Sequence, residues 1–367
     1  MNNHRIHLSL LLCLLLCPAA PVFAAPAAKD KGEVVFPPPP DKPRLRLLRS
    51  IRSAMDLKGQ KPGLLRKFLS ALSGDDAESS VVVRPYGIWV RGDLIYLTDT
   101  EGQKVVVLDQ KTAKVRTVEG TGSASLGSPV GVTADDAGNL YVSDTGDHTV
   151  KAFGPDGKLL WTSPGPGGAD GMFKRPSGLG WTLAGELMVL DSGNGRIVAL
   201  SKEGKSLRVF CKNMKDPFAL PNPGNLWVEK DGAFLVSDPL LGRVHIFAAD
   251  GKYISGFGEL GDSAGYMARP RGVASDSDGN IYVADAMFNR VQLFNRKGQV
   301  LMYFGGPGQE PGQLALPAGI FIDASDKVYV VDSKNRRVQV FQYIKYPEEK
   351  TGSTEPAKEE TPAKPSK

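Results

Sequence analysis

Short runs that alternate between apolar and small or polar residues recur along the chain at a nearly constant interval. Six of them read IYLTD, LYVSD, LMVLD, FLVSD, IYVAD and VYVVD. Each run ends in an aspartate, and these are Asp99, Asp144, Asp191, Asp238, Asp285 and Asp332. The step between neighbouring aspartates is 45 residues once and 47 residues four times, so the chain is built from six copies of one unit.

Each unit predicts four short β-strands that are separated by turn residues. In the fifth unit the strands are GVASD, NIYVAD, RVQLF and QVLMYFG, and the separators are SDG, AMFN and NRKG. No 3.6-residue apolar pattern lasts for ten residues inside a unit, which excludes a helical solenoid. Six units of four antiparallel strands predict an all-β fold, a six-bladed β-propeller.

A proline opens every unit, and a glycine follows two residues later in all units but the fourth. The prolines are Pro85, Pro129, Pro176, Pro223, Pro270 and Pro317, and the later positions hold Gly87, Gly131, Gly178, Asn225, Gly272 and Gly319. The fifth and sixth units, from RPRGVASDSDGNIYVAD to VYVVDSKNRRVQVF, resemble successive NHL repeats. The resemblance covers roughly residues 84–341 of the repeat region 84–345 and implies the same propeller fold.

The two ends of this region carry a narrower resemblance. The opening VVFPPPPDKPRLRLLRS and the closing VYVVDSKNRRVQVFQYI are similar to exported bacterial NHL propellers, which are often encoded beside multihaem c-type cytochromes. The resemblance implies that the partners of this protein are other exported proteins, among them multihaem c-type cytochromes.

The sixth unit supplies only three strands, because the chain after Lys345 is rich in Pro, Glu, Lys and Thr. Pro43–Ile51 has the length and alternation of the missing outer strand. We therefore predict that residues 43–51 close the ring as the fourth strand of the last blade, which also removes an open sheet edge. Prolines cannot donate hydrogen bonds to a sheet, so the Pro-rich leader (25–42) is expected to end where pairing begins.

Segments outside the repeats predict targeting and linking functions. Residues 1–24 have the cationic start, ten-residue apolar run and small-residue cleavage site of a signal peptide, with a lipid-modified Cys17 as the alternative. This predicts export to the periplasm or the outer cell surface. The linker 52–83 contains an amphipathic helix at 62–74, which either caps the propeller or contacts a partner or membrane surface. Residues 346–367 are expected to be a disordered tail.

The charges do not favour nucleic-acid binding, since a net charge of +5 over 367 residues is weak and dispersed. A basic residue follows five positions after most of the aspartates. These residues are Lys104, Arg196, Arg243, Arg290 and Arg337, with Thr149 as the exception. Because the aspartate ends one strand and the basic residue opens the next, we predict a structural pair across each hairpin.

Catalytic and cofactor signals are weak. After the expected cleavage, His148 and His245 are the remaining histidines, and they occupy different positions in their repeats. The chain has no CxxCH haem-attachment motif. DSDGN at 276–280 begins like a calcium loop, but Met287 stands where such a loop needs glutamate. Cys211 is expected to be a packed strand residue. We therefore predict no catalytic residues, no metal and no cofactor.

One group of residues stands out from the scaffold. The turns between second and third strands are mostly polar or small, but the fourth and fifth units carry PLLG and AMFN. This predicts a partner-binding patch on one rim, or packing against neighbouring loops, with polar support from nearby arginines. The predicted residues are Leu240, Leu241, Met287, Phe288, Arg175, Arg269 and Arg271.

These patterns favour a non-catalytic protein-binding scaffold that helps to assemble or position multihaem cytochrome electron-transfer complexes. Two alternatives stay open, because a fold does not set a function. One is a metal-dependent hydrolase or lyase of the lactonase or amidating-lyase type. The other is binding of cell-wall material or polysaccharide.

Overall fold

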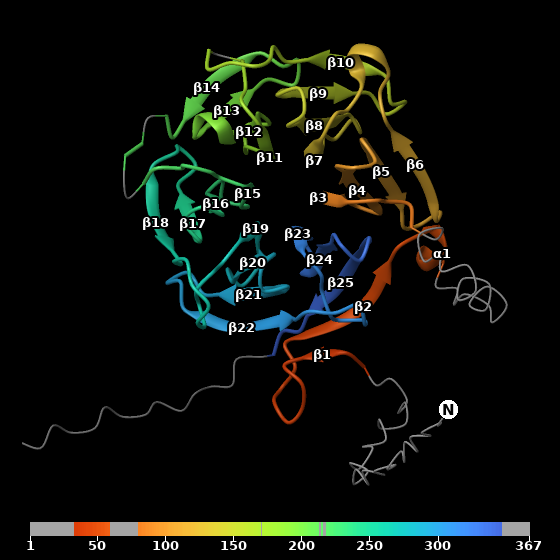
Figure 1. The fold of residues 1–367 in the computed structure, drawn as a ribbon, viewed down its shortest axis with the longest axis vertical. Coiled ribbons are helices and arrows are strands. Elements are labelled where there is room, and N and C mark those ends of the chain that lie inside the picture. Colours follow the sequence, from red (N-terminus) through yellow and green to blue (C-terminus); the bar gives the residue numbers. More distant parts are fainter. Residues whose placement is uncertain (1–32, 59–79, 170, 213, 216–217, 347–367) are drawn as a thin grey trace, which may run out of the picture. The chain divides into compact units, whose positions relative to one another are not determined.

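The computed structural model describes residues 33–58, 80–169, 171–212, 214–215 and 218–346. The predicted signal peptide, the helix at 62–74 and the tail from 347 lie outside these residues. The strands belong to one compact unit that starts at Val34. Figure 1 shows six sheets arranged as blades around a central axis, which confirms the six-bladed all-β propeller.

The first three blades are four-stranded antiparallel sheets, and each runs from an innermost first strand to an outer fourth strand. Blade 1 contains β3 (Pro85–Arg91), β4 (Leu94–Asp99), β5 (Lys104–Asp109) and β6 (Lys114–Val118). Blade 2 contains β7 (Pro129–Ala134), β8 (Leu140–Asp144), β9 (Thr149–Phe153) and β10 (Leu159–Thr162). Blade 3 contains β11 (Pro176–Trp181), β12 (Leu187–Asp191), β13 (Arg196–Leu200) and β14 (Ser206–Phe210).

The last three blades repeat this order, and blade 6 is completed by the start of the chain. Blade 4 contains β15 (Asn225–Val228), β16 (Phe234–Asp238), β17 (Arg243–Phe247) and β18 (Tyr253–Phe257). Blade 5 contains β19 (Pro270–Ser275), β20 (Ile281–Asp285), β21 (Arg290–Phe294) and β22 (Val300–Gly305). Blade 6 contains β23 (Pro317–Ile322), β24 (Lys327–Asp332), β25 (Arg337–Tyr343), β2 (Leu45–Ile51) and β1 (Val35–Phe36).

The predicted closure of the ring is present. Strand β2 pairs antiparallel with β25, from Leu45 opposite Tyr343 to Ile51 opposite Val338. The expectation that pairing begins after the prolines was wrong. Strand β1 precedes them and pairs with β2, because the proline stretch forms a hairpin loop instead of a leader. Phe36 of β1 packs edge-on against Phe341, which anchors this fifth strand.

The helical content near the start of the described chain is small. α1 (Ala54–Leu57) is a single turn, capped at Ser53, whose hydroxyl accepts a hydrogen bond from the Met55 N–H. Two short 3-10 turns lie at Gly122–Ala124 and Ser192–Asn194. None of the helices in the described ranges has the length and apolar character needed to cross a bilayer.

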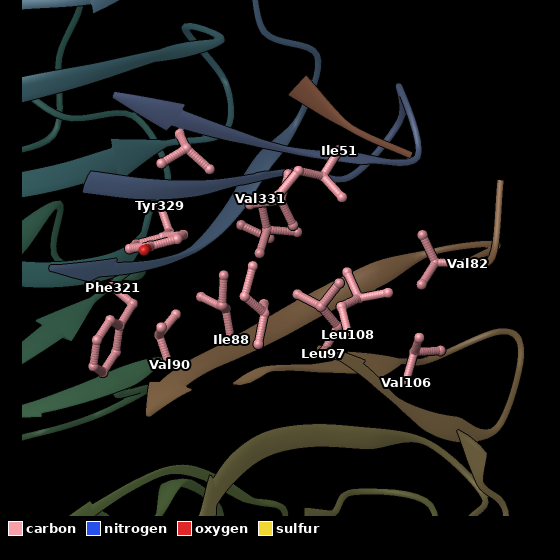
Figure 2. Packing of buried hydrophobic residues seen from close by; sticks show 14 of the residues in the cluster. Ile51, Val82, Ile88, Val90, Leu97, Val106, Leu108, Phe321, Tyr329 and Val331 are labelled. Atoms are coloured by element: carbon pink, nitrogen blue, oxygen red, sulfur yellow. The ribbon is translucent and has the colours of Figure 1, made fainter. Parts of the chain in front are cut away.

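The core consists of apolar layers between neighbouring blades. Ile51 of β2 joins Ile88 and Leu108 of blade 1 and Val331 of blade 6 in one of these layers, as Figure 2 shows. The closing strand therefore contributes hydrophobic burial as well as backbone pairing. Burying each such side chain stabilises the fold by roughly 1.5–3 kcal/mol.

The repeated glycine of the first strands marks a close approach between blades. A Cβ atom on Gly87 would lie 2.1 Å from the carbonyl oxygen of Val130 in blade 2. One on Gly319 would lie 2.6 Å from the carbonyl oxygen of Tyr86, where blade 6 meets blade 1. The sequence repeats glycine there because neighbouring innermost strands nearly touch.

Candidate functional site

The six repeated aspartates end the second strands on one face of the ring, which we call the aspartate rim. All six carboxylates are fully buried. In blade 1 the Asp99 carboxylate accepts hydrogen bonds from the N–H groups of Val83, at 2.7 Å, and Arg84, at 2.8 Å. The equivalent donors in the other blades are Gly127 and Ser128, Lys174, Asn222, Ala268 and Arg269, and Ala315.

The aspartates therefore fix the loop that enters the first strand of their own blade. The sequence pattern had suggested only a partner across the hairpin. The signal for the second function was the proline 14 or 15 residues before each aspartate, because the donors lie one or two positions before that proline.

The predicted structural pairs face each other in register in all blades, from Asp99 opposite Lys104 to Asp332 opposite Arg337. Two of them form buried ion pairs. Arg196 Nε lies 2.8 Å from Asp191, and Arg337 Nε lies 2.6 Å from Asp332. Burial raises the pKa of Asp332 and lowers that of Arg337, and the attraction between the two opposes both shifts.

Each paired arginine also binds the loop before its blade. Arg337 donates to the carbonyl oxygens of Gln309, Glu310 and Gln313. Arg196 makes the same three-carbonyl contact with residues 168, 169 and 172. These arginines therefore make structural contacts in blades 3 and 6.

The predicted ion pair does not form elsewhere in the described ranges. In blade 2, where Thr149 replaces the basic residue, buried Lys151 lies 3.5 Å from Asp144 and supplies the cation. Lys104, Arg243 and Arg290 make no ion pair with any described carboxylate. In blade 5 the reason is visible, because backbone N–H groups of both neighbouring loops bind the Asp285 carboxylate. The Arg290 guanidinium instead lies over the rings of Phe288, at 4.5 Å, and Tyr303, at 4.9 Å.

The predicted apolar patch lies on the aspartate rim in neighbouring blades 4 and 5. Leu240, in the β16–β17 turn, is 55% exposed, and Met287, in the β20–β21 turn, is 59% exposed. Leu241 and Phe288 are half-buried. Two of the four predicted apolar side chains, Leu240 and Met287, are therefore exposed, and Phe288 packs on Arg290.

Loops between the blades enlarge this patch in a way that the sequence pattern missed. A Cβ atom on Gly242 would lie 2.8 Å from the Leu260 backbone nitrogen, so the loop before blade 5 adjoins the Leu240 turn. The Leu316 N–H donates to the Asn289 side chain, which connects the loop before blade 6 to the Met287 turn. Leu260 and Leu316 are both exposed. We call Leu240, Leu260, Met287 and Leu316 the apolar rim patch.

The three predicted arginines lie on the same rim at different places. Arg175 and Arg269 are exposed, and each directly precedes a first-strand proline, in blades 3 and 5. The Arg175 N–H donates to His148 Nδ1 of blade 2, so this arginine lies away from the apolar rim patch. Arg271 is half-buried at the start of β19, and its guanidinium lies 5.4 Å from the Tyr86 ring centroid.

The side chains that could take part in catalysis lie apart from one another in the described structure. His148 is in a turn of blade 2, and His245 is fully buried in β17 with no hydrogen-bond partner for either ring nitrogen. Burial, then the charge of Arg243, lowers the pKa of His245 to about 4. Cys211 follows β14 directly and is buried, which raises the pKa of its thiol to about 12. Among the described residues no group of acidic, histidine and cysteine side chains could bind a metal ion.

The calcium-like segment 276–280 is the turn between β19 and β20, as predicted. One oxygen of the Asp276 carboxylate accepts the N–H groups of Asp278 and Asn280, and the other accepts the Tyr282 hydroxyl. Both oxygens of the Asp276 carboxylate are therefore occupied by hydrogen bonds from its own hairpin.

A pocket of about 310 Å³ opens near the other ends of the strands, between blades 4, 5 and 6. Trp227, Glu229 and Arg296 contribute to its lining. The Glu229 carboxylate already binds the Ser275 hydroxyl and the Arg296 guanidinium. The charge of Glu229, one of several carboxylates in this lining, is therefore neutralised within the protein.

Comparison with known proteins agrees with this architecture. The family model for the NHL repeat matches residues 126–153 and 267–294, which contain the first three strands of blades 2 and 5. The chain is a six-bladed β-propeller, and it contains NHL repeats. A search of curated proteins found no match.

Solved structures share the fold at low sequence identity. A streptogramin B lyase is 17% identical with a TM-score of 0.52, covering 72% of this chain and 94% of the lyase. A virginiamycin B lyase from Staphylococcus aureus is 13% identical with a TM-score of 0.51, covering 71% of this chain and 96% of the lyase. A protein of unknown function from Bacteroides thetaiotaomicron is 18% identical with a TM-score of 0.55, covering 72% and 70%. At these identities the likeness concerns the fold alone.

Proposed function

We propose that this protein is an exported, non-catalytic scaffold that docks an acidic protein partner through the aspartate rim. The observation that carries the proposal is the exposure of Leu240 and Met287 on turns of adjacent blades. Contiguous apolar side chains on a polar rim are typical of protein interfaces, where they become buried on binding. The other turns of this rim carry polar or small residues, so the fold itself does not require apolar residues there.

The charges on the same rim indicate the sign of the charge on the partner's surface. Arg269 is exposed beside the apolar rim patch, and it follows Ala268 at the entrance to blade 5. Cationic residues around an apolar centre favour a partner with carboxylates at matching places and raise its association rate. We infer an acidic protein surface as the ligand of this rim.

Our specific candidates for the partner are exported multihaem c-type cytochromes, which the scaffold would assemble or position for electron transfer. The support is the resemblance of the segments around β2 and β25 to propellers encoded beside such cytochromes. The signal-like residues 1–24 support a common location in the periplasm or at the outer cell surface.

The test is a pull-down from the cell envelope with the full chain as bait, followed by staining for covalently bound haem. We expect a haem-containing protein to be captured and to be lost with the double variant Leu240→Asp/Met287→Asp. Leu160→Asp is the matched control, because Leu160 is 54% exposed on outer strand β10. Capture without haem would reject the cytochrome assignment. Equal capture by the double variant would reject the apolar rim patch.

The enzyme alternative is tested by a different measurement. The lyases that share this fold make a hydrolase or lyase activity worth measuring, although the likeness itself concerns only the fold. Stoichiometric zinc or calcium in the purified protein would favour that alternative over the scaffold. We expect metal analysis to give less than one equivalent.

A further inference from the structure

Arg271 occupies a position around the central axis where the other blades carry no charge. It is the residue between the first-strand proline and the repeated glycine of blade 5. The equivalent residues in the other blades are Tyr86, Val130, Ser177, Gly224 and Ala318. The innermost strands β3, β7, β11, β15, β19 and β23 surround the central axis in Figure 1, and this position lies at their ends on the aspartate rim. We call this end of the axis the channel mouth.

The neighbours of Arg271 leave room for its side chain. Gly224 in blade 4 and Ala318 in blade 6 have the smallest side chains of the set. The guanidinium passes blade 6 and lies over the Tyr86 ring of blade 1, 5.4 Å from its centroid. The Ser237 hydroxyl fixes the Arg271 carbonyl, so the backbone beneath the side chain is held in place.

The charge of Arg271 is not balanced inside the protein. None of the described carboxylates lies within ion-pair distance of its guanidinium, and the described residues accept no hydrogen bond from it. Burial, together with the positive charges of Arg269 and Arg84, lowers the pKa of Arg271, although the Tyr86 hydroxyl opposes this shift. Arg84 itself is paired with Glu101 at 3.0 Å. A half-buried cation without a counter-ion is unfavourable for folding, so an external anion would relieve it.

Farther along the axis, aromatic side chains of the inner strands pack against one another. Phe321 of β23 packs against Trp89 of β3, at 5.0 Å, and against Trp227 of β15, at 5.3 Å. Each of these residues is three positions beyond the mouth, or about 10 Å at the rise of a strand. The Trp89 Nε1–H is buried and has no hydrogen-bond partner. A ligand at the mouth would therefore meet a cation first and aromatic surface below it.

We infer that the channel mouth is a carboxylate-binding site in which Arg271 is the anchor. Its planar guanidinium can donate two parallel hydrogen bonds to one carboxylate, and the Tyr86 ring orients that plane. Arg269 adds positive charge at the rim. The carboxylate comes either from a free small molecule or from an acidic group of a docked protein, and the first source does not depend on the proposed scaffold function.

The first experiment uses the full chain and free carboxylates. We would titrate sodium acetate and sodium succinate against sodium chloride at constant ionic strength and measure the unfolding midpoint. A saturable rise with carboxylate but not with chloride is expected, and Arg271→Gln should weaken the apparent affinity about tenfold or more. Arg175→Gln is the matched control, since Arg175 is an exposed arginine on the same rim. An equal response of Arg271→Gln would overturn the site.

The second experiment distinguishes the source of the carboxylate. Suppose that free carboxylates give no response. If Arg271→Gln then loses capture of the haem protein and Arg175→Gln keeps it, the carboxylate belongs to the docked partner. If neither measurement depends on Arg271, the inference is wrong. If no partner is captured at all, the proposed function fails, and the titration alone decides the site.

Discussion

The hydroxyl of Ser143 joins blade 2 to blade 3 by donating a hydrogen bond to the carbonyl oxygen of Ser177 at 2.5 Å. The same hydroxyl accepts the Gly131 N–H at 2.8 Å, so one side chain serves two first strands. Thr98 connects blade 1 to blade 2 in the same way, and Ser237 connects blade 4 to blade 5. The equivalent residues of blades 3, 5 and 6 are Leu190, Ala284 and Val331, which have no hydroxyl.

Removing this connection should destabilise the ring. Ser143→Ala leaves a buried carbonyl and a buried N–H without their partner, which costs about 1–3 kcal/mol of the free energy of unfolding. Urea denaturation measures the effect. Ser123→Ala serves as the control, because Ser123 is exposed in a loop of the same region, and it should leave the midpoint unchanged. A stability of Ser143→Ala equal to that of the wild type would show that the inter-blade hydrogen bond has no net effect.

Replacing a rim arginine that forms an ion pair should destabilise the protein more than replacing one that does not. Arg337→Met removes the partner of buried Asp332 and three loop contacts, and we expect a loss of about 3 kcal/mol or more. Arg290→Met loses contacts with two aromatic rings and a 3.3 Å hydrogen bond to the Gln292 side chain, which together are worth about 1–2 kcal/mol. Thermal unfolding of both variants tests this order, and the opposite order would contradict the distinction between paired and unpaired arginines.

Buried His245 should make the stability depend on pH. Its pKa is lowered from 6.5 to about 4, so between these values the unfolded chain binds a proton that the folded protein rejects. This contribution to stability is complete above about pH 6.5 and is lost as the pH falls towards 4, by about 3 kcal/mol. Valine occupies the equivalent position in blades 1 and 3, as Val106 and Val198.

His245→Val should therefore fold and should remove this part of the pH dependence. The measurement is the free energy of unfolding of both proteins at pH 7 and at pH 4.5. His148→Ala is the control, since His148 lies in a turn and not in the core. An unchanged difference between the two pH values in His245→Val would assign the acid sensitivity to other groups.

Closure by the start of the chain should be essential. Deletion of residues up to Ser53 removes β1 and β2, exposes the edge of β25 and takes Leu45 and Ile51 out of the core. We expect loss of cooperative thermal unfolding. A chain ending at Tyr346 keeps all described strands of blade 6 and should unfold within a few degrees of the full chain. Equal melting of the two truncated proteins would contradict the closure.

Much of the fold could be predicted from local patterns. The period of the aspartates gave the number of blades, and the missing strand of the sixth unit identified β2 before any contact was known. Strand β1 could not be predicted, because two residues before four prolines carry no periodic pattern. Its place depends on Phe36 packing against Phe304 and Phe341, residues about 270 and 300 positions away in the chain.

The candidate site was predicted less completely. Leu240 and Met287 are exposed on adjacent turns, as the sequence suggested, but Leu260 and Leu316 join them only through loops of other blades. Arg290 faces Asp285 across its hairpin, as the repeat predicts, but the sequence could not show that the two form no ion pair. The Asp285 carboxylate opposite it accepts four described backbone N–H groups, whereas the Asp332 carboxylate, which does pair with an arginine, accepts one.

The sequence by itself determined the strands other than β1, their order within each blade, the number of blades and the residues that close the ring. These features follow from periodicity and turn residues, which act between neighbours in the chain. The tertiary structure decided which of the repeated arginines form an ion pair with their aspartate. This depends on how deeply each carboxylate is buried and on how many backbone N–H groups already bind it, and both depend on contacts outside the strand itself. The tertiary structure also placed Arg271 at the channel mouth, where none of the described carboxylates forms an ion pair with it.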